Sequence, residues 1–81
     1  MRIEIAGNGH VLAGTPKQVL MQMKSLTVGA GRMTLREFIE RNIARIAHDA
    51  NVQVELAGQT DDELAESFLN QMLDRGYARS V

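Results

Sequence analysis

Residues 2–13 read RIEIAGNGHVLA and predict a β-hairpin at the start of the chain. Ile3 and Ile5 alternate with polar residues before the central glycines, and Val11–Ala13 resumes an apolar run after them. Asn8-Gly9 is the residue pair most typical of a two-residue type I′ turn, because both positions need a positive φ. The sequence therefore predicts two antiparallel strands joined by a tight turn.

A two-residue turn also determines the register of the predicted hairpin. It would place Ile5 opposite Leu12 and Gly7 opposite His10. Because side chains alternate between the faces of a strand, one face would then carry Ile3, Ile5 and Leu12. The other face would carry Glu4, Ala6, Val11 and Ala13. This second face is more apolar than a face surrounded by solvent needs to be.

Three later stretches carry the signals of α-helices, and each begins with a threonine capping box. Thr15, Thr34 and Thr60 are each followed by Gln or Glu three residues later, which allows two reciprocal hydrogen bonds at a helix start. Apolar residues then recur at helical spacing, so each helix has a face for the core. For the first helix this face comprises Val19, Leu20, Met23 and Leu26. The expected helix ends are marked by Gly29, Asn51 and Gly76.

Between the second and third helices, residues 52–56 read VQVEL and alternate apolar with polar side chains. This alternation predicts a strand with one buried face, and residues 77–81 could add a final short strand. The predicted order is therefore ββααβα with an optional last strand, in an α+β fold whose helices pack on one face of a small sheet. A chain of 81 residues has room for one such core, so we expect a single domain over residues 1–81.

Composition excludes several classes of protein. Of the 81 residues, 44% are hydrophobic and 23% are charged, which is ordinary for a globular domain and unlike a disordered or collagen-like chain. The chain has no cysteine, so a disulfide scaffold and a thiolate metal site are excluded. No apolar run is long enough to cross a membrane, and the alternating N-terminus does not resemble a signal peptide. We expect a cytoplasmic protein that does not enter a membrane.

Patterns that carry chemistry are sparse. The glycines around Gly7 and Gly14 lack the spacing of a phosphate-binding loop, and Pro16 removes a backbone amide that such a loop would use. His10 and His48 are far apart in the sequence and have no ligand-like spacing to carboxylates. The acidic residues at the start of the third helix are explained by the helix dipole. We therefore expect no catalytic residue, no cofactor and no metal site, and we predict that the chain is not an enzyme.

The charges divide unevenly along the chain, although the net charge is only −1. Residues 1–45 carry seven basic and three acidic side chains, whereas residues 46–81 carry two basic and seven acidic ones. The favoured interpretation is that basic and acidic helices lie side by side and neutralise each other. The alternative is a small nucleic-acid-binding or regulatory protein that contacts phosphates through Arg36, Arg41 and Arg45. The pI near 6.1 and the scarcity of aromatic side chains for stacking disfavour this alternative.

The motif IxIxGxGxVxxGTPxxV, residues 3–19, resembles the opening of small phage- and prophage-type proteins of uncharacterised function. In that family a short N-terminal hairpin is followed by a helix that starts at Gly-Thr-Pro. The resemblance implies no reaction and no ligand. It does imply a phage or mobile-element origin for the chain.

The remaining signals point to contacts with other protein chains. Met21 is one of five methionines and lies off the apolar face of its predicted helix, where an adaptable side chain suits a protein contact. The predicted strand at residues 52–56 would leave a weakly guarded sheet edge, and Val11 and Ala13 lie on the apolar outer face of the hairpin. We therefore expect a homodimer about a two-fold axis, with contacts from Val11, Ala13 and Met21. The leading hypothesis is a non-enzymatic protein-interaction or accessory module that self-associates.

Overall fold

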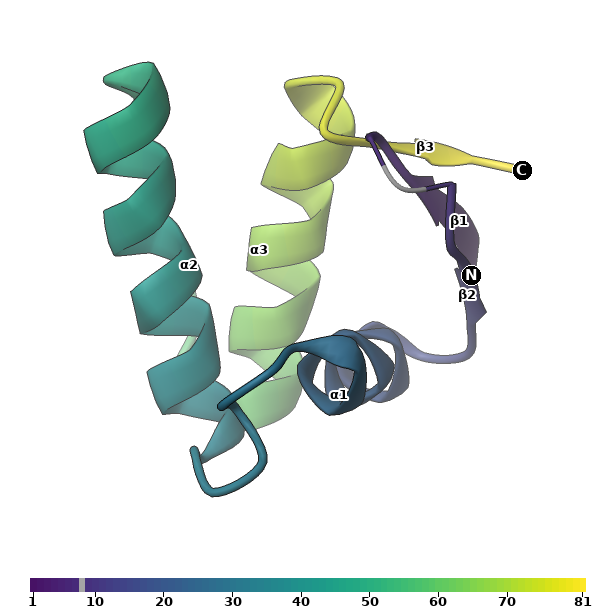
Figure 1. Cartoon of the computed structure of the whole chain (residues 1–81), viewed down its shortest axis with the longest axis horizontal. Helices are drawn as coiled ribbons and strands as arrows, with labels where there is room; N and C mark the ends of the chain where they lie inside the picture. Colours follow the sequence, from purple (N-terminus) through teal and green to yellow (C-terminus); the bar gives the residue numbers. More distant parts are fainter. Residues whose placement is uncertain (8) are drawn as a thin grey trace.

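The computed structural model describes residues 1–7 and 9–81 of the chain. Within these residues, a three-stranded antiparallel sheet is combined with three helices, so the predicted α+β class is confirmed (Figure 1). The strands are β1 (Arg2–Ile5), β2 (Val11–Ala13) and β3 (Ala78–Ser80), and the helices are α1 (Pro16–Leu26), α2 (Leu35–Ala50) and α3 (Asp61–Asp74). The sheet order is β2-β1-β3, so the first strand lies at the centre and the optional last strand, now confirmed, forms one edge.

The helices form two layers on one side of the sheet. α1 packs beside β2 and α3 packs beside β3, while α2 contacts α1 and α3 on the side away from the sheet (Figure 1). One hydrophobic core joins these layers. Its largest fully buried side chains are Phe68, Ile3, Leu20, Ile39, Leu69 and Val19. Among the described residues, no helix has both the length and the apolar composition needed to cross a membrane.

The hairpin forms with a register that differs from the predicted one. Ile3 lies opposite Leu12, and the N–H of Ile5 donates to the carbonyl oxygen of His10 at 2.9 Å. The predicted pairs, Ile5 with Leu12 and Gly7 with His10, are therefore wrong by two positions. The observed register places the two buried strand residues opposite each other, so packing under the helices outweighs the local preference for a tight turn.

The shift by two positions leaves the predicted faces of the hairpin unchanged, since side chains alternate with a period of two. Ile3 and Leu12 are buried under the helices, whereas Val11 and Ala13 are exposed on the outer face. The predicted Asn8-Gly9 turn includes residue 8, which lies outside the described residues.

All three predicted capping boxes are present, so the predicted helix starts are confirmed. At each start the threonine hydroxyl accepts from the backbone N–H three residues later; the pairs are Thr15 with Gln18, Thr34 with Glu37 and Thr60 with Glu63. The second side chain of each pair accepts in return from the backbone N–H of the threonine. α2 ends as predicted at Asn51, whose φ of 52° places it in the left-handed region.

The strand predicted at residues 52–56 is wrong, because these residues join no sheet within the described part of the chain. The side chains still alternate in burial: Val54 is only 8% exposed, whereas Gln53 and Glu55 are exposed. We call residues 52–57 the docked segment, because their backbone is bonded to side chains of α3.

Side chains of α3 and of its C-cap residue take the place of a partner strand for the docked segment. Three hydrogen bonds follow one another; they join Gln53 to Arg75, Glu55 to Gln71 and Ala57 to Ser67. The first two use carbonyl oxygens of the segment as acceptors, and the third uses the N–H of Ala57 as a donor to Oγ of Ser67 at 3.0 Å. Two residues of extended chain span about 6.6 Å, close to the roughly 6 Å that four residues of helix cover. Because these spacings match, one helix face can bond to every second residue of the segment.

Candidate functional site

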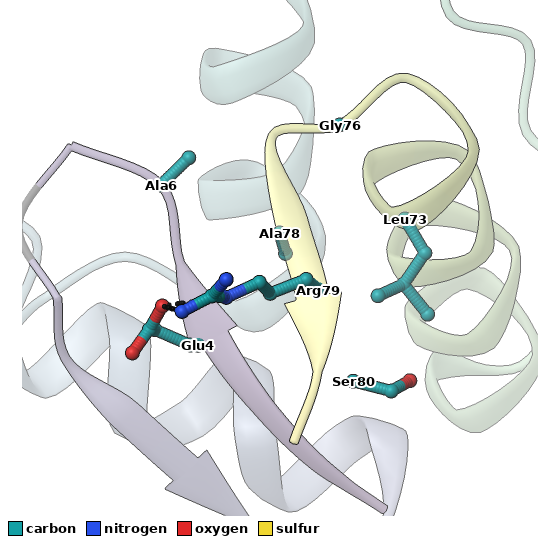
Figure 2. A pocket seen from close by; sticks show the side chains of 7 residues that line it. All are labelled: Glu4, Ala6, Leu73, Gly76, Ala78, Arg79 and Ser80. Atoms are coloured by element: carbon teal, nitrogen blue, oxygen red, sulfur yellow. Dashed lines mark hydrogen bonds and ion pairs between the residues drawn. The ribbon is translucent and has the colours of Figure 1, made fainter.

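The outer face of the sheet carries an ion pair between two strands. Glu4 of β1 and Arg79 of β3 lie opposite each other, and Oε1 of Glu4 accepts from Nε and Nη2 of Arg79 at 2.7 and 2.6 Å. The Arg79 side chain is 74% exposed, so the pair contributes little to stability, on the order of 0–1 kcal/mol. The pair holds the guanidinium group over the outer face of the sheet, beside the central strand β1 (Figure 2).

An open hollow of about 570 Å³ lies around β3 and is lined by residues from β1, from β3 and from the end of α3 (Figure 2). Its lining includes Ala6, Leu73, Ala78, Arg79 and Ser80. In Figure 2 the Leu73 side chain extends from α3 into the space beside β3, whereas the Arg79 side chain lies across the sheet toward β1. The hollow therefore combines an apolar wall, a strand edge and a charged rim.

Large apolar side chains are exposed at the other edge of the sheet, around β2 and α1. Val11 of β2 is 44% exposed, and Met21 and Leu26 of α1 are 43% and 57% exposed. Met21 and Leu26 also line an open hollow of about 410 Å³, together with Leu12 of β2. We call Val11, Met21 and Leu26 the β2-side patch.

The structure places the predicted interface residues Val11, Ala13 and Met21 at the surface around β2. Val11 and Ala13 lie on the outer face of that strand, and Met21 lies on α1, which packs beside it. The predicted burial of Leu26 on the apolar face of the first helix is wrong. α1 ends at Leu26, so no further turn of the helix covers this side chain.

The structure places the three predicted phosphate-contacting side chains, Arg36, Arg41 and Arg45, on two sides of α2, with Arg41 and Arg45 one turn apart on the same side. Nη2 of Arg36 donates to the carbonyl oxygen of Gln59 at 2.6 Å, whereas Nη2 of Arg45 donates to Oδ1 of Asn42 at 2.8 Å. At about 100° per residue, Arg36 and Arg45 lie on opposite sides of the helix. The three guanidinium groups are therefore not brought together, and nucleic-acid binding through them stays a prediction.

A polar pair lies in an otherwise apolar hollow between α2, α3 and the end of β1. This hollow has a volume of about 210 Å³, and its lining includes Ile5, Asn42, Arg45 and Met72. Asn42 is buried, with Nδ2 donating to the carbonyl oxygen of Phe38 at 2.8 Å and Oδ1 accepting from Arg45. In the sequence, Asn42 stands out because it interrupts the apolar stripe of the second helix. Both polar groups of Asn42 are bonded within α2, and the hollow is smaller than the roughly 300–1,000 Å³ of ligand pockets, so we assign no site to this hollow alone.

The two carboxyl groups with a shifted pKa serve helix caps. The backbone N–H of Thr34 and then its hydroxyl hold the pKa of Glu37 below 4.5. The hydroxyl of Thr60 and then its backbone N–H do the same for the pKa of Glu63. Both side chains are exposed, so neither carboxylate is set into a pocket. Among the described residues, no group of three or more His, Asp or Glu side chains is arranged to hold a metal ion.

Comparison of the chain with protein-family models, with curated proteins and with solved structures gives no match. The resemblance of residues 3–19 to phage- and prophage-type proteins stays a prediction. Function is therefore inferred from the surfaces of the molecule, above all from the β2-side patch. The ion pair on the outer face of the sheet was not predicted, because Glu4 and Arg79 are 75 residues apart in the sequence.

Proposed function

We propose that the chain is a non-enzymatic, cytoplasmic protein-interaction module that forms a homodimer through the β2-side patch. The observation that carries this proposal is the exposure of Val11, Met21 and Leu26 around one edge of the sheet. Large apolar side chains gathered at a surface mark sites of contact with other proteins. The absence of cysteine from the sequence agrees with a reducing compartment such as the cytoplasm.

Burial of the β2-side patch would supply the driving force for the dimer. Complete burial of one such side chain is worth about 1.5–3 kcal/mol, and roughly half of that gain remains for side chains that are already half-buried. In a dimer with a two-fold axis, each of these side chains is buried on both copies, so each contributes to the interface two times. A stable interface covers about 800 Å² on each partner, which is roughly 15% of the 5233 Å² accessible surface of the chain. The interface therefore extends beyond the patch to its neighbours, which include Gln22 and Ser25.

One backbone acceptor at the edge of β2 is already occupied, which disfavours strand pairing between two copies there. Nε2 of Gln22, a residue of α1, donates to the carbonyl oxygen of Ala13 at 2.7 Å. We therefore place α1 of one copy against α1 of the other, with Met21 near the axis. Methionine suits this position, because its flexible thioether adapts to an irregular partner surface.

Sedimentation equilibrium at micromolar concentration tests the dimer. We expect the wild-type chain to show twice the 9.0 kDa mass of one chain. Met21→Glu and Leu26→Glu should each show the mass of one chain, because an unpaired charge is costly to bury. Ala44→Glu, at an exposed position of α2, is the matched control and should stay dimeric. A wild-type mass near 9.0 kDa at every accessible concentration would contradict the proposal.

A further inference from the structure

We propose that a groove between α2 and the end of β1 binds a small carboxylate with an apolar tail, such as a medium-chain fatty acid. The carboxylate would bond to the guanidinium group of Arg45, and the tail would lie against apolar side chains of α3. This inference goes beyond the proposed dimer, because it concerns a ligand held within one chain and not the contact between two copies.

The groove consists of two adjoining hollows. The hollow of about 210 Å³ described above lies next to a second one of about 250 Å³, which is lined by residues of β1, β2, α1 and α2. Ile5, Met23, Asn42 and Arg45 line both hollows. α2 packs on α1 and α3 rather than on the strands (Figure 1). The two hollows therefore form one groove, with the polar pair of α2 at the place where they meet.

The first hollow offers an apolar surface for the tail of a ligand. Its lining includes Phe68, Leu69 and Met72 of α3, which are buried. It also includes Ile5 and Ile46, which are half-buried and pack against the core. A half-buried apolar side chain still has surface that a ligand can remove from water. Ligand pockets combine such a lining with a few polar groups that fix the orientation of the ligand.

The charge in the groove is positive. Arg45 is the one residue with a permanent charge among the described residues that line the hollows, and none of these residues is acidic. Nη2 of Arg45 donates to the neutral amide oxygen of Asn42, and no carboxylate in the described part of the chain forms an ion pair with it. A guanidinium group without a carboxylate partner, beside an apolar hollow, favours a ligand with one negative charge.

Asn42 holds the guanidinium group at the groove. It lies three residues before Arg45, on the same face of α2, and it is buried in a stripe that is otherwise apolar. An apolar residue at this position would avoid the cost of burying an amide. Because its Oδ1 accepts from Nη2 of Arg45 at 2.8 Å, the guanidinium group is kept beside both hollows. The remaining N–H donors of the guanidinium group can bind a carboxylate.

The size and charge of the groove favour a fatty acid over other anions. The planar guanidinium group matches the two oxygens of a carboxylate. A phosphate monoester carries about −1.5 to −2 charges at neutral pH, which is more than one guanidinium group neutralises. One turn of a peptide helix, about 10 Å across and about 5.4 Å long, occupies on the order of 400 Å³, which is more than either hollow holds. We therefore identify the ligand as a single apolar chain that ends in one carboxylate.

Isothermal titration calorimetry with octanoate tests this proposal. Octanol has the same chain without the charge, and we expect octanoate to bind about ten-fold more tightly, as hydrogen bonds to a charged group supply. Hexanoate has a shorter tail, and each methylene that is added from hexanoate to octanoate should tighten binding about four-fold. Octyl phosphate should bind more weakly than octanoate, because its second charge has no partner in the groove.

Three variants separate the roles of the polar pair from general effects. Arg45→Gln should bind octanoate and octanol alike. Arg41→Gln is the matched control, because Arg41 lies one turn before Arg45 on α2 and lines neither hollow, and it should keep the ten-fold preference. Asn42→Leu should weaken the binding of octanoate without weakening that of octanol, since Arg45 loses its acceptor but the apolar surface remains.

A fourth variant keeps this site distinct from the proposed dimer. Met21→Glu is expected to be a single chain, and Met21 lines neither hollow of the groove. It should bind octanoate as the wild type does, so a failure of the dimer and a failure of this site are distinguishable.

Methyl chemical shifts of methionine in NMR locate the bound octanoate. The largest changes should fall on Met23 and Met72, which line the first hollow, whereas Met1 and Met33 line neither and should stay unchanged. Equal affinity of the wild type for octanoate and octanol, tighter binding of octyl phosphate, or changes centred on other methionines would overturn the proposal. The absence of any binding at millimolar octanoate would do the same.

Discussion

The docked segment and β3 both lie against α3, yet their backbones are held in different ways. β3 shares backbone hydrogen bonds with the central strand of the sheet. The docked segment instead bonds to Ser67 and Gln71 of α3 and to Arg75, which caps the end of that helix. Backbone groups in a sheet hold one another directly, whereas each side chain of α3 loses rotamer freedom when it bonds. A segment can thus be held against a helix without a partner strand, at a greater cost in entropy.

The largest expected effect compares the core of the sheet with the docked segment. Ile3→Ala should lower the free energy of unfolding by about 2–5 kcal/mol, because Ile3 is fully buried in the central strand. Val54→Ala should lower it by only about 1.5 kcal/mol, since two buried carbon groups are lost at about 0.8 kcal/mol each. Urea unfolding followed by circular dichroism measures both values. Equal losses would show that the docked segment supports the fold as strongly as the sheet does.

The next effect concerns Gly58, which directly follows the docked segment. Its φ is +109°, and an added Cβ would clash with the Cβ of Glu63 in the cap of α3. Gly58→Ala should therefore destabilise the chain by about 1–3 kcal/mol, through strain where the segment joins α3. Gly29 also has a positive φ, of +84°, but an added Cβ there would meet nothing within 4 Å.

Gly29→Ala is thus the matched control for Gly58→Ala, because it introduces backbone strain without a clash. Differential scanning calorimetry should show a smaller decrease in Tm for Gly29→Ala than for Gly58→Ala. Equal decreases would mean that the close packing of the segment against the cap of α3 adds nothing to stability.

Local signals predict most of this fold because they act within a few residues. Each capping box spans four residues, so the helix starts at Thr15, Thr34 and Thr60 are predictable without tertiary structure. Alternation at residues 52–56 likewise predicts the burial of Val54 correctly. It does not say which groups the backbone will meet, because these belong to α3 and depend on packing. The same limit applies to the hairpin, where alternation predicts the faces and packing determines the register.

The candidate surfaces are predictable to different degrees for the same reason. Val11 and Met21 lie off the apolar stripes of their elements, so their exposure follows from the sequence. Leu26 fits the helical spacing, but its exposure depends on where α1 ends. The Glu4–Arg79 pair joins residues 75 positions apart, and no local pattern around either residue indicates the other. A surface that is built from strands far apart in the sequence can therefore be recognised only in the tertiary structure.

A smaller effect should follow from removal of one helix-to-segment hydrogen bond. Gln71→Ala takes away the donor to the carbonyl oxygen of Glu55 and should cost about 1 kcal/mol. Hydrogen exchange should become faster at the amide of Ala57, further along the same segment, and stay unchanged at Val81 in the sheet. Asn70→Ala removes a neighbouring exposed amide of α3 and is the matched control. If both variants change the Ala57 amide equally, the Gln71 bond does not hold the segment.

The smallest expected effect is a loosening in acid where the docked segment leads into α3. Hydrogen bonds from the hydroxyl and then the backbone N–H of Thr60 hold the pKa of Glu63 below its usual 4.5. A carboxyl group with a lowered pKa in the folded state adds stability above its unfolded pKa. That stability is lost as the pH falls through the lower, folded pKa. The cap of α3 should therefore weaken in acid, and the end of the docked segment with it.

Hydrogen exchange at the amide of Thr60, which donates to Oε1 of Glu63 at 3.2 Å, measures this loss. Its protection factor should fall as the pH is lowered below about 4.5, the usual carboxyl pKa, toward the lower pKa of the folded state. Glu63→Gln is the matched control, because a neutral amide oxygen can accept the same bond, as Gln18 does in the cap of α1. The variant should keep its protection over this range, and so should the amide of Val81, whose acceptor is a backbone carbonyl of the central strand. If the wild type and Glu63→Gln lose protection alike, acid acts on the end of the segment through some group other than the cap carboxylate.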